Sequence, residues 1–104
     1  MRATIELRLF GDAEGGRTGP VAVGYSPDWI TGQRTPDGDD FHMGRIAWLE
    51  VDPLWPGHQS RAVVETFWPD GRGWTHLRTG DLLSVHEGSR AIGTATVVDP
   101  LTDT

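Results

Sequence analysis

The apolar residues of this chain alternate with polar ones along short segments. Over no stretch of a dozen positions do they recur at helical spacing. The clearest segment runs from Ala3 to Phe10, with Ala3, Ile5, Leu7 and Leu9 on one face and polar side chains on the other. A period of two is typical of a strand with one buried face. The pattern predicts an all-β fold.

Glycine and proline separate these segments, since 14 Gly and 7 Pro are spread along the chain. The strand-like segments are Ala3–Phe10, Pro20–Tyr25, Trp29–Thr31, His42–Val51, Arg61–Trp68, Asp81–Glu87 and Ala91–Val98. We expect about six strands in a small closed antiparallel barrel or sandwich, because closure removes exposed edge strands. Residues 1–104 are expected to form a single domain, with the barrel at about 3–98 and a short tail at 99–104.

Composition narrows the classes of function. There is no cysteine, so disulfides and thiolate metal sites are excluded. The chain has neither an apolar leader at its start nor a run of about 18 apolar residues, so we expect a cytoplasmic protein without membrane association. The net charge is -6 and lysine is absent. Because nucleic-acid binding depends on positive charge, this balance disfavours RNA as a partner.

Several motifs, taken in order, resemble the C-terminal β-barrel of translation elongation factor Tu. They cover almost the whole chain, from about Ala3 to Val98. The motifs are Glu14-Gly15-Gly16-Arg17-Thr18-Gly19-Pro20, Gly24-Tyr25-Ser26-Pro27, Trp55-Pro56-Gly57, Glu65-Thr66-Phe67-Trp68-Pro69 and the closing stretch from His86 to Val98. The resemblance implies the barrel fold of that domain, here without the GTPase domain and middle barrel of the full factor. With no lysine there can be no P-loop.

The resemblance also implies where a partner would bind. In the family this barrel contacts the T arm of aminoacyl-tRNA as well as protein partners. By resemblance, the binding residues would be Arg17, Thr18, Tyr25, Glu87, Gly88 and Arg90. Three departures remove charge that the family carries: Ser26 and His86 stand where basic residues are expected, and His58 where an acid is expected. The two losses of positive charge, at Ser26 and His86, argue against a tRNA role.

The glycines of these motifs have a physical role. Gly15, Gly16 and Gly88 would supply positive φ or room at tight corners. Gly93, inside a predicted strand, would mark a bend or a close backbone approach.

The sequence gives little indication of catalysis or metal binding. Asp39, Asp40 and His42 could hold a metal ion, but a solvated loop is favoured because the long EF-hand loop is missing. Ser84, His86 and Asp81 could be taken for a nucleophilic triad, yet closeness in sequence is no evidence for one, and no Gly-x-Ser-x-Gly motif is present. We therefore expect no enzyme activity, no bound metal and no cofactor.

The five tryptophans allow two interpretations. Trp48, in mid-strand, is expected in the core. Trp55, Trp68 and Trp74 lie beside Pro or Gly turns. They would either pack over the barrel ends, which is favoured, or form an aromatic contact patch of the kind found at interface hot spots.

The basic residues also allow two interpretations. Arg17, Arg78 and Arg90 would either form an anion site on one rim or, as we favour, pair with carboxylates such as Glu14 and Glu87. The resulting hypothesis is a non-catalytic module that binds a protein partner linked to translation. The alternatives are a tRNA-contacting domain and, last, a small-molecule carrier, since a small barrel is filled by its own side chains.

Overall fold

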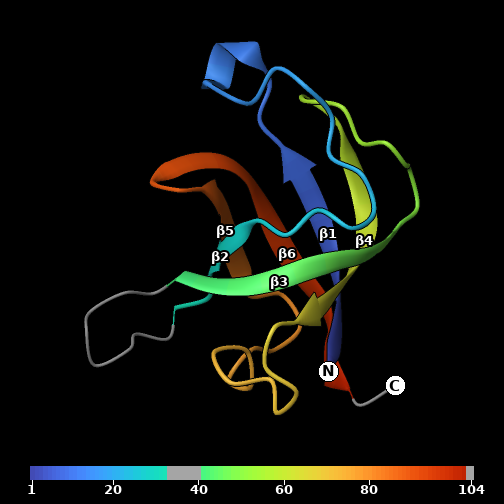
Figure 1. Cartoon of the computed structure of the whole chain (residues 1–104), viewed down its shortest axis with the longest axis vertical. Helices are drawn as coiled ribbons and strands as arrows, with labels where there is room; N and C mark the ends of the chain where they lie inside the picture. Colours follow the sequence, from blue (N-terminus) through green and yellow to red (C-terminus); the bar gives the residue numbers. More distant parts are fainter. Residues whose placement is uncertain (33–40, 103–104) are drawn as a thin grey trace.

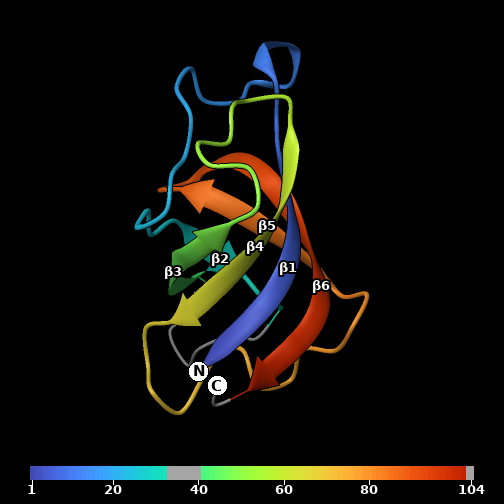
Figure 2. The same ribbon diagram turned by 90° about the vertical axis from the view of Figure 1, so that its right-hand side faces the viewer.

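The computed structural model describes residues 1–32 and 41–102, and in it the chain forms a closed six-stranded antiparallel barrel (Figures 1 and 2). The order of the strands around the barrel is β1-β4-β3-β2-β5-β6. A single turn of 3-10 helix, η1 (Asp12–Glu14), follows β1. The strands are β1 (Arg2–Leu9), β2 (Asp28–Ile30), β3 (Phe41–Leu49), β4 (Gln59–Thr66), β5 (Leu82–Glu87) and β6 (Arg90–Thr102). The predicted all-β barrel of about six strands is confirmed.

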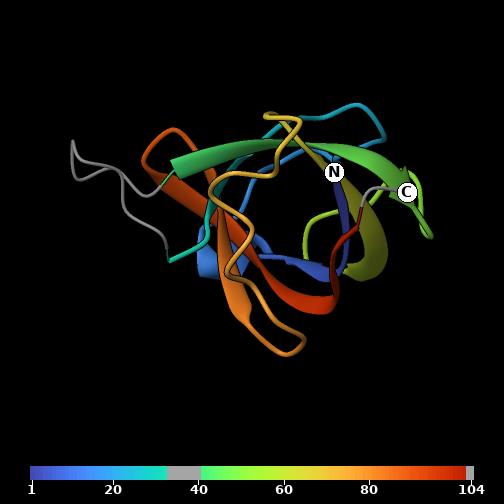
Figure 3. The same ribbon diagram turned by 90° about the horizontal axis from the view of Figure 1, so that it is seen from below.

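The alternation of apolar and polar residues correctly predicts which side chains of β1 face the core. Its four inward-facing residues, Ala3, Ile5, Leu7 and Leu9, are each at most 3% exposed. They meet the inward faces of β4 and β6, which pair with β1 on either side. The strands surround this core in Figure 3, where the barrel is seen from below. Most of its other members are Ile46, Leu49, Ala62, Val64, Leu83, Val85, Ile92, Ala95 and Val97.

Two predicted segments differ from the observed strands. The segment from Pro20 to Tyr25 is not a strand: it contributes an isolated bridge between Val21 and Leu54, and its backbone bonds to Ile46 at Gly24 and Tyr25. Gly24 has a φ of +99°, which interrupts extended backbone. At the other end of the chain, β6 continues to Thr102, past the expected end at Val98, and pairs there with Arg2.

The prediction that Trp48 lies in the core is wrong, because its side chain is 47% exposed. The β3–β4 register shifts between Ile46 and Trp48, which is a β-bulge. An extra residue in one strand reverses the alternation beyond it. As a result Ile46 and Leu49, three positions apart, both point inward, while Trp48 points out.

Gly93 is the close backbone approach that the sequence predicts. A Cβ at this position would lie 2.4 Å from the carbonyl oxygen of Arg8 in the neighbouring strand. Only a residue without a side chain lets β6 pass β1 at this distance.

Two tryptophans fill one end of the barrel. Trp29 of β2 and Trp74 of the β4–β5 connection are 0% and 1% exposed, and their rings meet edge to face at 5.6 Å. The indole N–H of Trp29 donates to the carbonyl of Gly44. Within the described residues, no helix combines the length and the apolar character needed to cross a bilayer.

Candidate functional site

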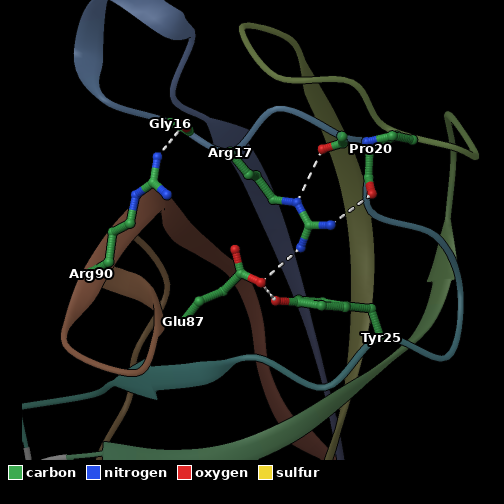
Figure 4. A network of polar contacts seen from close by, with 7 residues as sticks. Gly16, Arg17, Pro20, Tyr25, Glu87 and Arg90 are labelled. Atoms are coloured by element: carbon green, nitrogen blue, oxygen red, sulfur yellow. Dashed lines mark hydrogen bonds and ion pairs between the residues drawn. The ribbon is translucent and has the colours of Figure 1, made fainter.

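Four of the six binding residues predicted by resemblance come together at one rim of the barrel (Figure 4). Arg17 of the loop after η1 forms an ion pair with Glu87, at 3.0 Å between Nη1 and Oε2. The hydroxyl of Tyr25 donates to the same carboxylate oxygen at 2.5 Å. The Arg17 guanidinium also lies over the Tyr25 ring, 4.9 Å from its centre. These three side chains tie the long 11–25 connection to the end of β5.

The environment of Tyr25 changes its acidity. Burial, followed by the hydrogen bond to the Glu87 carboxylate, raises the pKa of Tyr25 to about 12. Near neutral pH the phenol therefore remains a proton donor to Glu87, and the cluster is stable as a hydrogen-bonded unit.

Both arginines of this rim are also bound to backbone carbonyls. Arg17 donates to the carbonyls of Gly19, at 3.0 Å, and Pro20, at 3.2 Å. Arg90, at the start of β6, donates to those of Gly15, at 2.7 Å, and Gly16. Donors used in this way hold the loop in place and are not directed outward at a ligand. Of the other two predicted residues, Thr18 is exposed on the loop and Gly88 occupies the β5–β6 turn.

Gly16 shows why this loop needs its glycines. A Cβ on Gly16 would lie 2.0 Å from the carbonyl oxygen of Phe10, so the backbone passes where no side chain fits. The predicted close packing at this corner is thus confirmed.

The alternative of an anion site formed by Arg17, Arg78 and Arg90 is not supported by their positions. The backbone N–H of Arg78 bonds to Asp81 just before β5 begins, whereas Arg90 follows the far end of that strand. The expected pairing of Arg17 with Glu87 is confirmed, but Glu14 pairs with Arg8 at 2.9 Å instead.

The predicted aromatic patch of Trp55, Trp68 and Trp74 also does not form. Trp74 is buried, whereas Trp55 and Trp68 are 54% and 46% exposed. Trp55 lies in the turn bonded to Leu9 at the end of β1, and Trp68 follows the β4 residue bonded to Met1 at the beginning of β1. The eight residues of β1 separate these ends by roughly 25 Å. Figure 1 likewise shows the two connections at opposite ends of the barrel.

A different apolar surface lies where β3 meets the residues that follow β4. Phe41 and Met43 are two positions apart on the outer face of β3, and the carbonyl of Met43 accepts a hydrogen bond from the backbone N–H of Phe67. The rings of Phe67 and Trp68 meet edge to face at 5.1 Å. These four side chains, 38–58% exposed, are called the anchor patch below. The sequence did not predict it, because two of its members belong to β3 and the other two follow β4, and only strand pairing brings them together.

A hollow of about 220 Å³ opens beside the anchor patch. Its apolar wall is formed by Met43 and Phe67, and its charged rim by Arg45 and Glu65, 3.6 Å apart. Gly44 contributes backbone alone. The remaining lining residues are Ser26 and Thr66. A larger groove of about 420 Å³ lies along β1 and β6, lined in part by Arg2 and Asp99, but Arg2 is paired with Glu65 at 3.1 Å.

The structure brings together two of the three residues weighed as a triad. Ser84 Oγ and His86 Nε2 are 2.8 Å apart on the outer face of β5. Asp81 precedes the other end of that strand, where its carboxylate accepts the backbone N–H of Arg78. The second ring nitrogen of His86 is buried and has no hydrogen-bond partner. No carboxylate therefore orients the His86 ring through Nδ1, as the third member of a nucleophilic triad would.

The suggested metal ligands Asp39 and Asp40 lie outside the described residues. Across residues 1–32 and 41–102, no group of three or more potential ligand side chains is arranged to hold a metal ion. No protein-family model matches the chain, and a search of curated proteins finds no significant relative. Its function has to be inferred from the residues themselves.

Proposed function

We propose that this chain is a non-catalytic protein-binding module and that it binds its partner through the anchor patch. The observation that carries the proposal is the set of four large apolar side chains, each at least 38% exposed, on β3 and on the residues that follow β4. Two of them, Met43 and Phe67, line a hollow. Taking roughly 200 Å² for each fully exposed side chain, the patch exposes about 400 Å². Contiguous apolar patches of this size are often functional.

The chemistry of the patch fits a protein partner. Phe and Trp provide large contact areas with few rotatable bonds, and such residues dominate interface hot spots. The ion pair of Arg45 and Glu65 supplies a polar rim, which is the usual border of an apolar interface core. Catalysis has less support, since Ser84 and His86 are together on β5 but Asp81 precedes the other end of that strand and binds the N–H of Arg78.

We further propose that the partner is linked to translation. Support comes from the ordered motifs that resemble those of the elongation factor Tu C-terminal barrel, and a closed six-stranded barrel is consistent with that resemblance. A partner of that kind would be part of the translation machinery, or a toxin that recognises elongation factor Tu and for which this chain acts as a decoy.

The tRNA-contacting alternative has less support. It depends on Arg17 and Arg90, whose guanidinium groups are bound to loop carbonyls and, for Arg17, to Glu87. To bind phosphate, both guanidinium groups would have to give up these hydrogen bonds. In addition, the net charge of -6 opposes the approach of RNA.

Affinity capture from the protein's own lysate tests the proposal, using wild type, Phe67→Ser and Trp55→Ser. Trp55 is as exposed as Phe67 but lies at the opposite end, so Trp55→Ser is the matched control. We expect a protein captured by the wild type and by Trp55→Ser to be lost with Phe67→Ser. Equal recovery of the captured protein by all three chains would refute the proposal that the anchor patch binds the partner. Recovery of tRNA that falls steeply with salt would support the alternative.

A further inference from the structure

We propose that the partner segment received by the anchor patch is positively charged and inserts one apolar side chain into the hollow beside Met43 and Phe67. This inference rests on the proposed function and specifies the chemistry of the partner. Its starting point is the pairing of an apolar surface with a strongly acidic chain, whose net charge is -6.

The hollow fits a side chain better than a free ligand. Its volume of about 220 Å³ lies below the roughly 300–1,000 Å³ of most small-molecule sites. The side chains of Met43 and Phe67 and the backbone of Gly44, a residue of β3, line the hollow, so an inserted apolar group would contact both apolar side chains and peptide backbone. The pair of Arg45 and Glu65 at the rim can meet the polar backbone on either side of the inserted residue.

A second copy of this chain is a poor occupant. Two anchor patches facing each other would bury about 800 Å² in total, whereas stable specific interfaces bury roughly 1,200–2,000 Å². Each copy would also bring a net charge of -6 to the contact. Repulsion between like charges opposes an association whose apolar gain is already small.

The net charge of the whole chain, together with two carboxylates near the patch, favours a cationic segment. Asp28 lies beside Met43 in the β2–β3 ladder, and Asp70 follows Trp68 by two positions. Asp70 pairs with Arg72 at 3.0 Å, and the Arg72 guanidinium lies over the Trp68 ring, 4.4 Å from its centre, so this part of the patch already binds a cation of the chain itself. Both members of the ion pair are about 60% exposed, and exposed pairs of this kind are weak, so a cation of the partner can replace Arg72 there. Glu65 is held by Arg2 and Arg45. A segment with Lys or Arg beside its apolar residue can therefore interact with Asp28 and Asp70 while the field of the whole chain attracts it.

Photo-crosslinking combined with charge substitution tests this inference. The full chain would carry p-benzoylphenylalanine in place of Phe67, with the same replacement at Trp55 as the control, and crosslinked segments would be identified after capture from lysate. In the Phe67 crosslinker chain, Met43→Lys and Met43→Glu add opposite charges at one position that is 48% exposed, so folding should tolerate both. We expect a crosslinked segment rich in Lys or Arg around an apolar residue. We also expect at least a roughly tenfold lower yield with Met43→Lys than with Met43→Glu.

The outcomes separate the two proposals. A crosslink to an acidic or neutral segment, or equal losses with Met43→Lys and Met43→Glu, would overturn the charge inference and leave the protein-binding function standing. A crosslink to a second copy of the chain would overturn the inference in favour of self-association. No crosslink specific to position 67 would refute the proposed function and this inference with it.

Discussion

Replacing Gly93 with alanine tests whether the close passage of β6 over β1 is a requirement of this barrel. The new Cβ would lie 2.4 Å from the carbonyl oxygen of Arg8 and 3.2 Å from the Cα of Leu9, where ordinary contact begins at about 3.4 Å. The obstructing atoms belong to backbone, so no side-chain rotation relieves the clash. The two strands would have to separate by about 1 Å.

The cost can be estimated from similar overpacking, which destabilises by about 1–3 kcal/mol. Gly→Ala returns up to about 1 kcal/mol by restricting the unfolded chain, so we expect a net loss of about 1–2 kcal/mol in the free energy of unfolding. For a domain of this size that corresponds to a fall in Tm of roughly 4–16 °C. Thermal and urea unfolding followed by far-UV circular dichroism measure both quantities.

Gly19→Ala is the matched control for this prediction. A Cβ on Gly19 would meet no atom within 4 Å, and its backbone φ is not in the left-handed region. Its Tm should change by no more than about 2 °C, as for surface substitutions generally. If Gly93→Ala unfolds at the same temperature as Gly19→Ala, the strands do not approach as the structure shows and the reasoning is wrong.

Three further predictions concern the rim and the tryptophans. Tyr25 is the single tyrosine, so absorbance titration of the folded chain should show its ionisation near pH 12 and that of the urea-unfolded chain near pH 10. Because the folded pKa is the higher one, the stabilisation it reports is complete below about pH 10 and is lost as the pH rises toward 12; coinciding titrations would contradict this. Arg90→Met should lower the unfolding free energy by about 1 kcal/mol and speed amide exchange in the 15–20 loop, whereas Arg72→Met, at an exposed pair, should do neither. Acrylamide should quench two classes of tryptophan, and a chain with the exposed class replaced by Phe should keep only blue-shifted, protected emission; uniform quenching would refute the assigned burial. The buried class is Trp29 and Trp74, and the exposed class is Trp48, Trp55 and Trp68.

The sequence by itself determined the fold class and most of the strands. Alternation between Ala3 and Leu9 identified both the strand and its buried face, because a period of two leaves one geometry that hides the apolar side chains. The sequence also predicted the close approach of two strands at Gly93. A glycine inside a strand-like segment indicates that a neighbouring backbone passes too near for a side chain.

Tertiary structure alone decided which side chains face outward together. Trp48 lies outside the core because a bulge in β3 shifts the register of that strand. The order of apolar and polar residues in this segment does not show where the bulge lies. Trp74, placed by sequence beside exposed turns, became core because the β4–β5 connection folds back against Trp29. The anchor patch joins β3 to residues that follow β4, about two dozen positions later in the chain. Such a surface exists only once the barrel has closed, since it depends on strand pairing and not on sequence neighbours.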